Sequence, residues 1–346
     1  MKDDYLWNRS GKPDPDIQQL ESLLGRLRFD RPPPGFPAPA ADVAIPPVRS
    51  RMWVMLRQPV FYAAVASVTL AVLAATVWFV LDRPAYEVVG LGGFPAVDAQ
   101  PFVGTGQLRV GQWLETDASS RARIQVGKIG QVDVEPNTRI GLVRARATEH
   151  RLSLQRGVMH AVIWAPPRLF FVNTPSAEAI DLGCAYTLEV DDHGHGLLRV
   201  ASGWVAFERS GRESFVPGGA ECLTRPGIGP GTPYMGDAVP AFRSALEKLD
   251  FGSAGPASRS VELAALLLNA RVEDGLTLWH LLFRVGDAER PLVYDRLAEL
   301  VPPPRGVSRN AVISGDRRTL DLWWNELGLG TTEWWRLWKR ALPDSR

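Results

Sequence analysis

Two cysteines are the residues of this chain whose type most directly suggests redox chemistry. They are Cys184 and Cys222, and they lie in the second half of the sequence. In an exported β-domain, two thiols in an oxidising compartment most often pair. In the chain-entropy model, closing the loop between them stabilises a fold by about 3–4 kcal/mol. We therefore predict a disulfide between them, with two buried free thiols as the alternative.

The histidines His193 and His195 stand in the segment DDHGHG. Glycine and aspartate between two apolar runs are typical of a hairpin turn. The histidines of the chain form no ligand cluster with the cysteines at zinc-site spacing. We predict a solvated turn here and no metal site, with a metal bound by this loop as the alternative.

Sequence signatures of common enzymes are missing. There is no G-x-S-x-G elbow, no G-x-x-x-x-G-K-[ST] loop, no H-E-x-x-H pair, and no G-x-G-x-x-G between a strand and a helix. The glycine-rich segment 227–231 contains a proline and precedes no helix, which is typical of a linker. With 39 basic and 38 acidic residues, no net charge directs the chain to nucleic acid. We predict a protein with no catalytic residues, no cofactor and no direct nucleic-acid binding.

An uncharged apolar segment runs from Pro59 to Leu81. As a helix it would cross a hydrocarbon core of about 30 Å, and a buried core helix is the alternative. Arg49, Arg51 and Arg57 precede it, so the positive-inside rule keeps the N-terminus in the cytoplasm. These features predict a single-pass protein of the bacterial inner membrane that contacts the bilayer through residues 59–81, with periplasmic C-terminal domains.

The N-terminal segment 1–30 shows one amphipathic helix. Asp14 and Pro15 form a helix start, with an N-cap acceptor followed by proline at the first helical position. An apolar stripe then recurs at intervals of three and four residues. It consists of Ile17, Leu20, Leu24 and Leu27. Because a single helix has no core of its own, we predict that this stripe binds a partner protein. The proline-rich segment 31–58 is predicted to be a semi-rigid linker.

Period-two alternation replaces helical periodicity between residues 106 and 225. Short runs, separated by glycine, proline, asparagine or aspartate, predict an all-β sandwich, barrel or β-helix. Residues 82–105 are predicted to be a stalk, and residues 226–237 a linker. The predicted strands are 121–126, 131–134, 140–144, 151–155, 158–163, 169–173, 179–182, 185–190, 196–201, 203–208 and 213–216.

The order of three stretches carries a family resemblance. HRLSLQRGVMHAVI, then PPRLFFVNTPSAEAIDLGCAYTLEVDD, then GLLRVASGWVAFE, resembles the FecR domain of bacterial transmembrane regulators. The matching positions begin at Leu154 and Gly157 and end near Val205. The chain departs from the family at Cys184, where threonine is usual, and at Tyr186, where phenylalanine is usual. The resemblance implies a β-rich extracytoplasmic domain that acts in signalling across the inner membrane.

The C-terminal segment 238–346 returns to helical periodicity. Short helices with brief connections predict a small helical bundle. They are expected at residues 239–250, 260–269, 277–285, 291–300, 317–327 and 333–341. Five tryptophans lie between residues 323 and 338, and neighbours such as Trp334 and Trp335 cannot both face one core. Core packing explains most of them, and a contact with another subdomain or a partner is the alternative for at least one.

Together these features predict a bitopic membrane protein with an all-β, FecR-like sandwich or β-helix outside the cytoplasm and a C-terminal α-helical bundle. The expected function is non-enzymatic relay of an envelope signal, with a sigma factor held by the cytoplasmic tail. The alternative is an envelope scaffold whose β-domain binds a protein or a glycan. Partner-binding residues are predicted to be Ile17, Leu20, Leu24 and Leu27.

Overall fold

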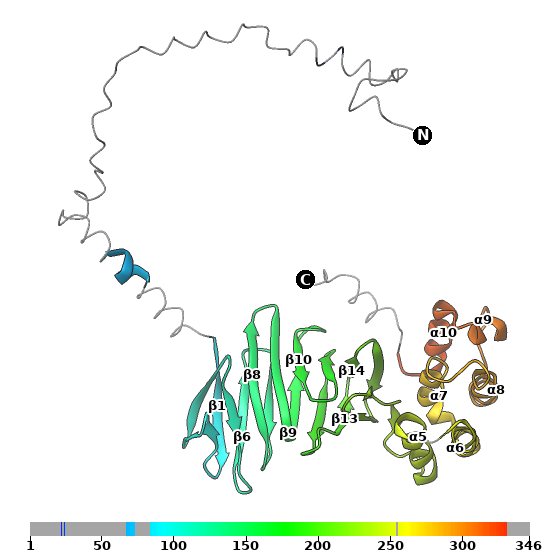
Figure 1. Ribbon diagram of the computed structural model, residues 1–346, viewed down its shortest axis with the longest axis horizontal. Helices are drawn as coiled ribbons and strands as arrows, with labels where there is room; N and C mark the ends of the chain where they lie inside the picture. The colour runs from blue at the N-terminus through cyan, green and yellow to red at the C-terminus, as the bar shows by residue number, and fades with distance from the viewer. Residues whose placement is uncertain (1–21, 23, 25–66, 73–83, 254, 331–346) are drawn as a thin grey trace, which may run out of the picture. The chain divides into compact units, whose positions relative to one another are not determined.

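The fold is a computed structural model that describes residues 22, 24, 67–72, 84–253 and 255–330. The chain divides into two compact units, 1–74 and 75–346. In the first unit, Ser22 and Leu24 are helical, as are residues 67–72. The second unit contains the strands and helices described below (Figure 1).

The prediction of a bitopic membrane protein is wrong. Among the residues that the structure describes, no helix is both long enough and apolar enough to cross a bilayer. Within the predicted span 59–81, the described residues are 67–72, and they are helical. The rest of that span lies outside the described residues. The same finding overturns the predicted inner-membrane localisation and the bilayer contact.

Two β-sheets make up most of the second unit, and they share one long strand. Sheet A runs in the order β4 (Thr105–Arg109), β1 (Ala85–Gly92), β6 (Arg121–Val126), β7 (Gly130–Val134), β9 (Glu149–Ile163), β12 (Ala185–Val190), β13 (Gly196–Ser202) and β16 (Ala220–Arg225). Strands β17 (Gly229–Pro230) and β18 (Tyr234–Met235) pair with β16. Every pairing in this sheet is antiparallel, which is why short turns suffice between many of its strands.

Sheet B contains the other part of β9. It runs in the order β3 (Gln100–Pro101), β2 (Ala96–Val97), β5 (Trp113–Glu115), β8 (Arg139–Arg146), β9, β10 (Phe170–Asn173), β11 (Glu178–Asp181), β14 (Trp204–Arg209) and β15 (Arg212–Pro217). The pairing of β9 with β10 is parallel, and the others are antiparallel. Apolar side chains that alternate along both sheets form one core, which includes Leu108, Ile124, Val132, Leu152, Leu188 and Val205.

The bend that moves β9 from one sheet to the other lies at Gly157. Before it, β9 pairs with β8 in sheet B; after it, β9 pairs with β7 and β12 in sheet A. Gly157 has a φ of +95°, and a Cβ built there would lie 2.2 Å from Thr138 Oγ1. Glycine alone meets both demands, because it takes positive φ at little cost and has no side chain.

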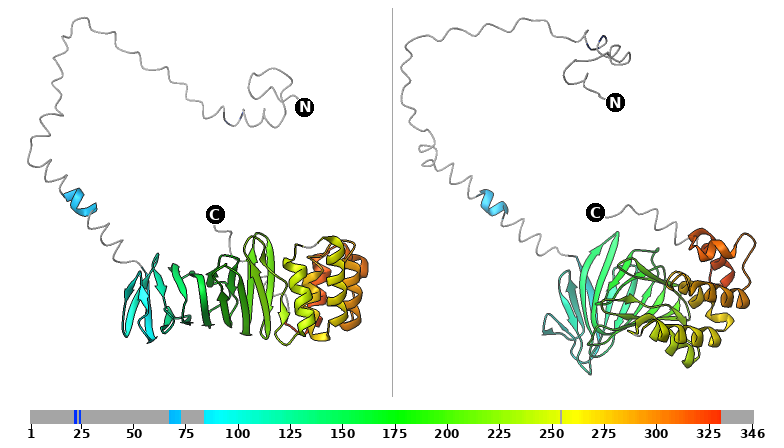
Figure 2. Two further views of the ribbon diagram at one scale, coloured as in Figure 1. Left: turned by 60° about the horizontal axis from the view of Figure 1, so that its bottom comes forward. Right: turned by 45° about the vertical axis from the view of Figure 1, so that its right-hand side comes forward.

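Short helices follow the strands. They are α5 (Pro240–Phe251), α6 (Pro256–Asn269), η1 (Val272–Asp274), α7 (Gly275–Leu281), α8 (Arg290–Leu300), α9 (Arg309–Ile313), α10 (Arg317–Trp324) and η2 (Asn325–Leu327). The proline at the start of α5, α6 and α8 has no donor to lose there. Figure 2 shows these helices beside the last strands of the sheets.

The predicted C-terminal helical bundle is also wrong. The α-helices range from five to fourteen residues, their buried side chains belong to the same core as those of the strands, and α7 contacts the β-sheet. Its His280 side chain accepts a hydrogen bond from the backbone of β15. The helix predicted at 333–341, and Trp334 and Trp335 within it, lie outside the described residues.

Candidate functional site

Helix α7 meets the outer edge of β15 through His280. The Nε2 atom of His280 accepts a hydrogen bond from the backbone N–H of Phe215 at 3.1 Å. Its Nδ1 atom lies 2.8 Å from the carbonyl oxygen of Leu276, which only accepts, so Nδ1 carries the proton. Burial, helped by the nearby Arg284 charge, lowers the pKa of His280 to about 3. This histidine is therefore neutral near pH 7, with both ring nitrogens occupied.

Arg284 follows His280 by four residues and bonds to the same edge strand. Its Nη2 donates to the carbonyl oxygen of Glu213 and to Ser214 Oγ, at 2.8 and 2.7 Å. Its Nη1 donates to Thr232 Oγ1 at 2.8 Å. Burial lowers the pKa of Arg284 to about 10, an effect that the Asp250 charge partly offsets. A buried guanidinium is thus still charged near pH 7 and satisfied by several oxygens.

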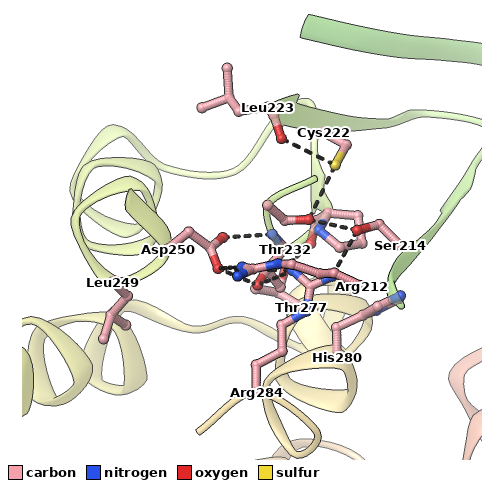
Figure 3. Close-up of polar contacts among 12 residues, drawn as sticks. Arg212, Ser214, Cys222, Leu223, Thr232, Leu249, Asp250, Thr277, His280 and Arg284 are labelled. Atoms are coloured by element: carbon pink, nitrogen blue, oxygen red, sulfur yellow. Dashed lines mark hydrogen bonds and ion pairs between the residues drawn. The ribbon is translucent and has the colours of Figure 1, made fainter. Parts of the chain in front are cut away.

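Asp250 supplies the negative charge of this cluster. Its carboxylate accepts from Arg212 Nη2 at 2.7 Å and from the backbone N–H of Thr232 at 2.5 Å, and lies 3.8 Å from Arg284 Nη1. Its side chain is 6% exposed. Figure 3 shows Arg212, Thr232, Asp250, His280 and Arg284 converging from β15, the loop before β18, α5, α7 and the turn after α7. We call these five residues the polar junction.

Aromatic side chains pack beside the polar junction. The ring centroid of Trp279, in α7, lies 4.7 Å from that of Trp324, in α10. Trp324 also lies 5.8 Å from Trp204 of β14, and Trp279 Nε1 donates to the carbonyl oxygen of Leu320 at 2.7 Å. Buried aromatic pairs contribute about 0.5–1.5 kcal/mol beyond area burial. The junction and these rings join the sheet to the helices.

A cleft of about 510 Å³ opens at this contact. Its lining includes Glu208, Arg212, Phe283, Arg284 and Arg317. The Nε atom of Arg212 is buried with no hydrogen-bond partner among the described residues, so an oxygen of water or of a ligand would satisfy it. The arrangement suits binding and positioning, because the nearest imidazole, that of His280, has no free nitrogen for proton transfer.

The structure corrects the predicted disulfide, because Cys184 and Cys222 are both free and buried. The thiol of Cys184 donates to Asp181 Oδ2 at 2.5 Å. The thiol of Cys222 donates to the carbonyl oxygen of Gly231 at 3.2 Å. Each thiol thus has its own partner in the core. Burial raises the pKa of Cys222 to about 12, so this thiol is not ionised near pH 7.

The other predicted site residues lie far from the polar junction in the sequence. Leu24 is helical and its side chain is 56% exposed, whereas Ile17, Leu20 and Leu27 lie outside the described residues. His195 Nδ1 is 3.0 Å from Asp191 in the turn between β12 and β13. Among the described residues, no three potential ligands gather into a metal site.

Sequence reasoning did not single out the polar junction. One signal was available: His280 and Arg284 stand four residues apart in an otherwise apolar segment, TLWHLLFRV. Residues at that spacing share a helix face, and two polar side chains on an apolar face need buried partners. The partners themselves, Ser214 and Thr232, show no pattern in the sequence that connects them with α7.

Comparison of the sequence with models of protein families and with curated proteins found no match. Two crystal structures of a "putative anti-sigma factor" from Parabacteroides distasonis are distantly similar to this fold. The first has a TM-score of 0.31 and 11% identity, over 34% of this chain and 56% of that one. The second has a TM-score of 0.32 and 12% identity, over 44% of this chain and 73% of that one.

The chain therefore spans little more than half the length of the first of these structures. At such TM-scores the likeness is too distant to argue for a function. Nothing in the comparisons shows the FecR resemblance.

Proposed function

We propose that this protein is a non-enzymatic regulator that holds a partner of the sigma-factor class through its N-terminal helical stripe, Ile17, Leu20, Leu24 and Leu27. The observation that carries the proposal is Leu24, which is helical with a side chain 56% exposed. An exposed leucine within a repeat of three- and four-residue intervals suits a helix that binds in a partner's groove.

The size of the stripe fits a reversible complex. Burying one leucine or isoleucine side chain contributes roughly 1.5–3 kcal/mol. Four such side chains give about 6–12 kcal/mol before the cost of association, which is at least about 4 kcal/mol. The surplus, at most about 2–8 kcal/mol, corresponds to dissociation constants from tens of millimolar to about micromolar. A contact of this strength holds a partner and releases it, as regulation requires.

The second unit would then receive the signal. The matching stretches between Leu154 and Val205 occur in the same order as in the FecR domain, and this resemblance supports a FecR-type domain in the second unit. The polar junction ties its sheets to its helices through charged side chains that bond to one another and to the backbone, so a ligand or partner bound at either part acts on one connected body. The cleft at the junction provides one place where such a signal would be bound.

Binding of the full chain to a panel of purified sigma factors tests the proposal. Biolayer interferometry should detect at least one complex with a dissociation constant of about 10 µM or tighter. An unrelated helical protein of matched charge serves as the negative control. If no sigma factor of the panel binds, the regulator proposal fails, and a scaffold that binds a protein or a glycan through its second unit takes its place.

A further inference from the structure

Strand β4 is the outermost strand of sheet A on one side among the described residues. It pairs with β1 alone, in an antiparallel register that sets Leu108 opposite Tyr86. The N–H of Gly90 donates to the carbonyl oxygen of Gly104, and the N–H of Val110 to that of Pro84. Hydrogen bonds to one neighbour alternate along an antiparallel strand. The bonds to β1 therefore belong to Gly106 and Leu108, and the backbone groups of Thr105 and Gln107 face away from β1.

The edge strand of sheet B, β15, differs from β4 because side chains bond to its outer backbone groups. There, His280 and Arg284 bond to the backbone of β15 and cover its edge. At β4, the described residues cover only Arg109: its backbone N–H donates to Gln112 Oε1 and its carbonyl oxygen accepts from the N–H of Gln112. The outward backbone groups of Thr105 and Gln107 have no such partner among the described residues. An uncovered edge presents alternating N–H and C=O groups, which are a template for another strand. Because such an edge is self-complementary in the antiparallel sense, a second copy of β4 fits it.

Two opposite charges beside this edge have no ion-pair partner among the described residues. Arg109, in β4, donates to Gln107 Oε1. Glu87, in β1, stands opposite Gln107 in the register and is exposed on the same face of the sheet. If two β4 strands pair about Gln107, each Arg109 stands opposite Thr105 of the other copy. The Cα atoms of Arg109 and of that copy's Glu87 are then roughly 12 Å apart, within reach of two extended side chains, while the two arginines are about 13 Å apart.

Exposed apolar side chains surround the start of β4. Val103 is 76% exposed and Phe94 is 66% exposed. Each is next in the chain to a residue of one backbone contact, in which the N–H of Phe102 donates to the carbonyl oxygen of Pro95 at 3.0 Å. Large apolar side chains gathered at a sheet edge favour contact with another protein surface.

We propose that two copies of this chain associate through β4, in antiparallel pairing centred on Gln107, so that sheet A continues from one copy into the other. The backbone of Gln107 then forms both hydrogen bonds with Gln107 of the second copy. A hydrogen-bonded antiparallel pair has a Cα–Cα distance of about 5.5 Å, which lies inside the range that a disulfide spans.

Cysteine cross-linking of the full chain tests this register. Gln107→Cys should give a covalent dimer under mild oxidation, and reductant should reverse it. Thr105→Cys is the matched control, because the two Thr105 positions would lie about 13 Å apart. The native thiols of Cys184 and Cys222 are buried, so they do not compete. Cross-linking of neither variant, or of both equally, would overturn the proposal.

Gln107→Pro provides a second measurement that preserves the fold. Its N–H faces away from β1, so proline removes a donor only from the outer edge. In sedimentation velocity at about 0.1 mM chain, the unmodified protein should be dimeric, and Gln107→Pro should weaken association at least tenfold with an unchanged circular dichroism spectrum. An unmodified protein that is monomeric at this concentration, or a folded Gln107→Pro variant that dimerises equally well, would rule out pairing through β4.

Discussion

Asp181 is a carboxyl group buried in the β core. It is 1% exposed. It accepts a hydrogen bond from the backbone N–H of Gly183 at 2.7 Å and another from the Cys184 thiol. Burial raises the pKa of Asp181 to about 7, because two hydrogen bonds compensate only part of the lost hydration. The group therefore titrates near neutrality, unlike an exposed aspartate.

Asp181→Asn should remove a pH dependence of stability. The folded-state pKa is raised from 3.8 to about 7, so the folded state binds more protons between these values. The stability that this proton provides is present at low pH and is lost as pH rises through 7, by up to about 4 kcal/mol. The unfolding free energy of the variant, relative to the unmodified chain, should therefore increase by a similar amount between pH 4 and pH 8.

Urea unfolding at a series of pH values measures this difference. Asp192→Asn is the control, because the Asp192 side chain is 80% exposed and its replacement should have little effect. A difference between Asp181→Asn and the unmodified chain that is constant from pH 4 to pH 8 would show that Asp181 is ionised throughout.

At the scale of the elements, tight corners between strands depend on glycine. Gly203 connects β13 with β14 at a φ of +75°, and a Cβ built there would lie 2.1 Å from the carbonyl oxygen of Gly183. Gly211, in the turn between β14 and β15, has a φ of +81° with nothing within 4 Å of the same position. An alanine at Gly203 would therefore suffer both a steric clash and backbone strain, whereas an alanine at Gly211 would suffer backbone strain alone.

Gly203→Ala should lower the free energy of unfolding by more than about 3 kcal/mol, because strain and a backbone clash add. Gly211→Ala, with strain alone, should cost about 1 kcal/mol. Chemical denaturation of both variants measures the difference. Equal costs would mean that the corner at Gly203 relaxes to accept a side chain.

Many strands could be predicted because one face of each is buried. The alternation in 121–126 and 185–190 predicts β6 and β12 at their observed bounds. Two predicted strands, 151–155 and 158–163, are one strand, β9, because Gly157 bends the chain without ending the ladder. β16 was not predicted, because its buried residues Ala220, Cys222 and Thr224 are small or polar. β1 lies in the predicted stalk, where glycines hid the alternation of Tyr86 and Val88.

The polar junction was harder to predict from the sequence than the strands were. His280 and Arg284 bond to β15, which lies more than sixty residues earlier in the chain. The residues that accept or donate there include backbone groups of Glu213 and Phe215, which carry no side-chain signature. Local patterns determine strands and helices, whereas this site depends on how α7 docks against a sheet edge.

At the scale of the second unit, the polar junction should couple the sheets to the helices in unfolding. Arg284→Met keeps the length of the side chain but removes the donors to Glu213, Ser214 and Thr232 and the charge near Asp250. Breaking a buried ion pair in this way costs about 3–5 kcal/mol. We expect tryptophan fluorescence and far-ultraviolet circular dichroism of the variant to show one unfolding transition. Its midpoint should lie at lower denaturant, and the free energy of unfolding should be smaller by about 3–5 kcal/mol.

Arg317→Met is the control for that measurement, because the Arg317 side chain is 64% exposed and its contact with Glu213 is 3.7 Å long. Its replacement should cost less than about 1 kcal/mol. Two separate transitions in the unmodified protein would contradict a junction that couples the sheets to the helices. A stability equal to that of Arg317→Met would contradict the structural role of Arg284.

At the scale of the whole molecule, we propose that the first unit binds the partner and that the second unit receives the signal. Leu20→Asp with Leu24→Asp places two charges on the apolar stripe. Gln18→Asp with Ser22→Asp is the matched control, because it adds the same charges at the same four-residue spacing beside the stripe. Neither pair of substitutions replaces a residue of the polar junction.

The most direct test is the dissociation constant of the sigma-factor complex for the full chain and for these two double variants. We predict that Leu20→Asp with Leu24→Asp weakens binding at least about 100-fold, since each buried leucine contributes roughly 1.5–3 kcal/mol. For Gln18→Asp with Ser22→Asp we predict a change of less than about threefold. Equal affinities for both double variants would contradict the assignment of partner binding to the stripe.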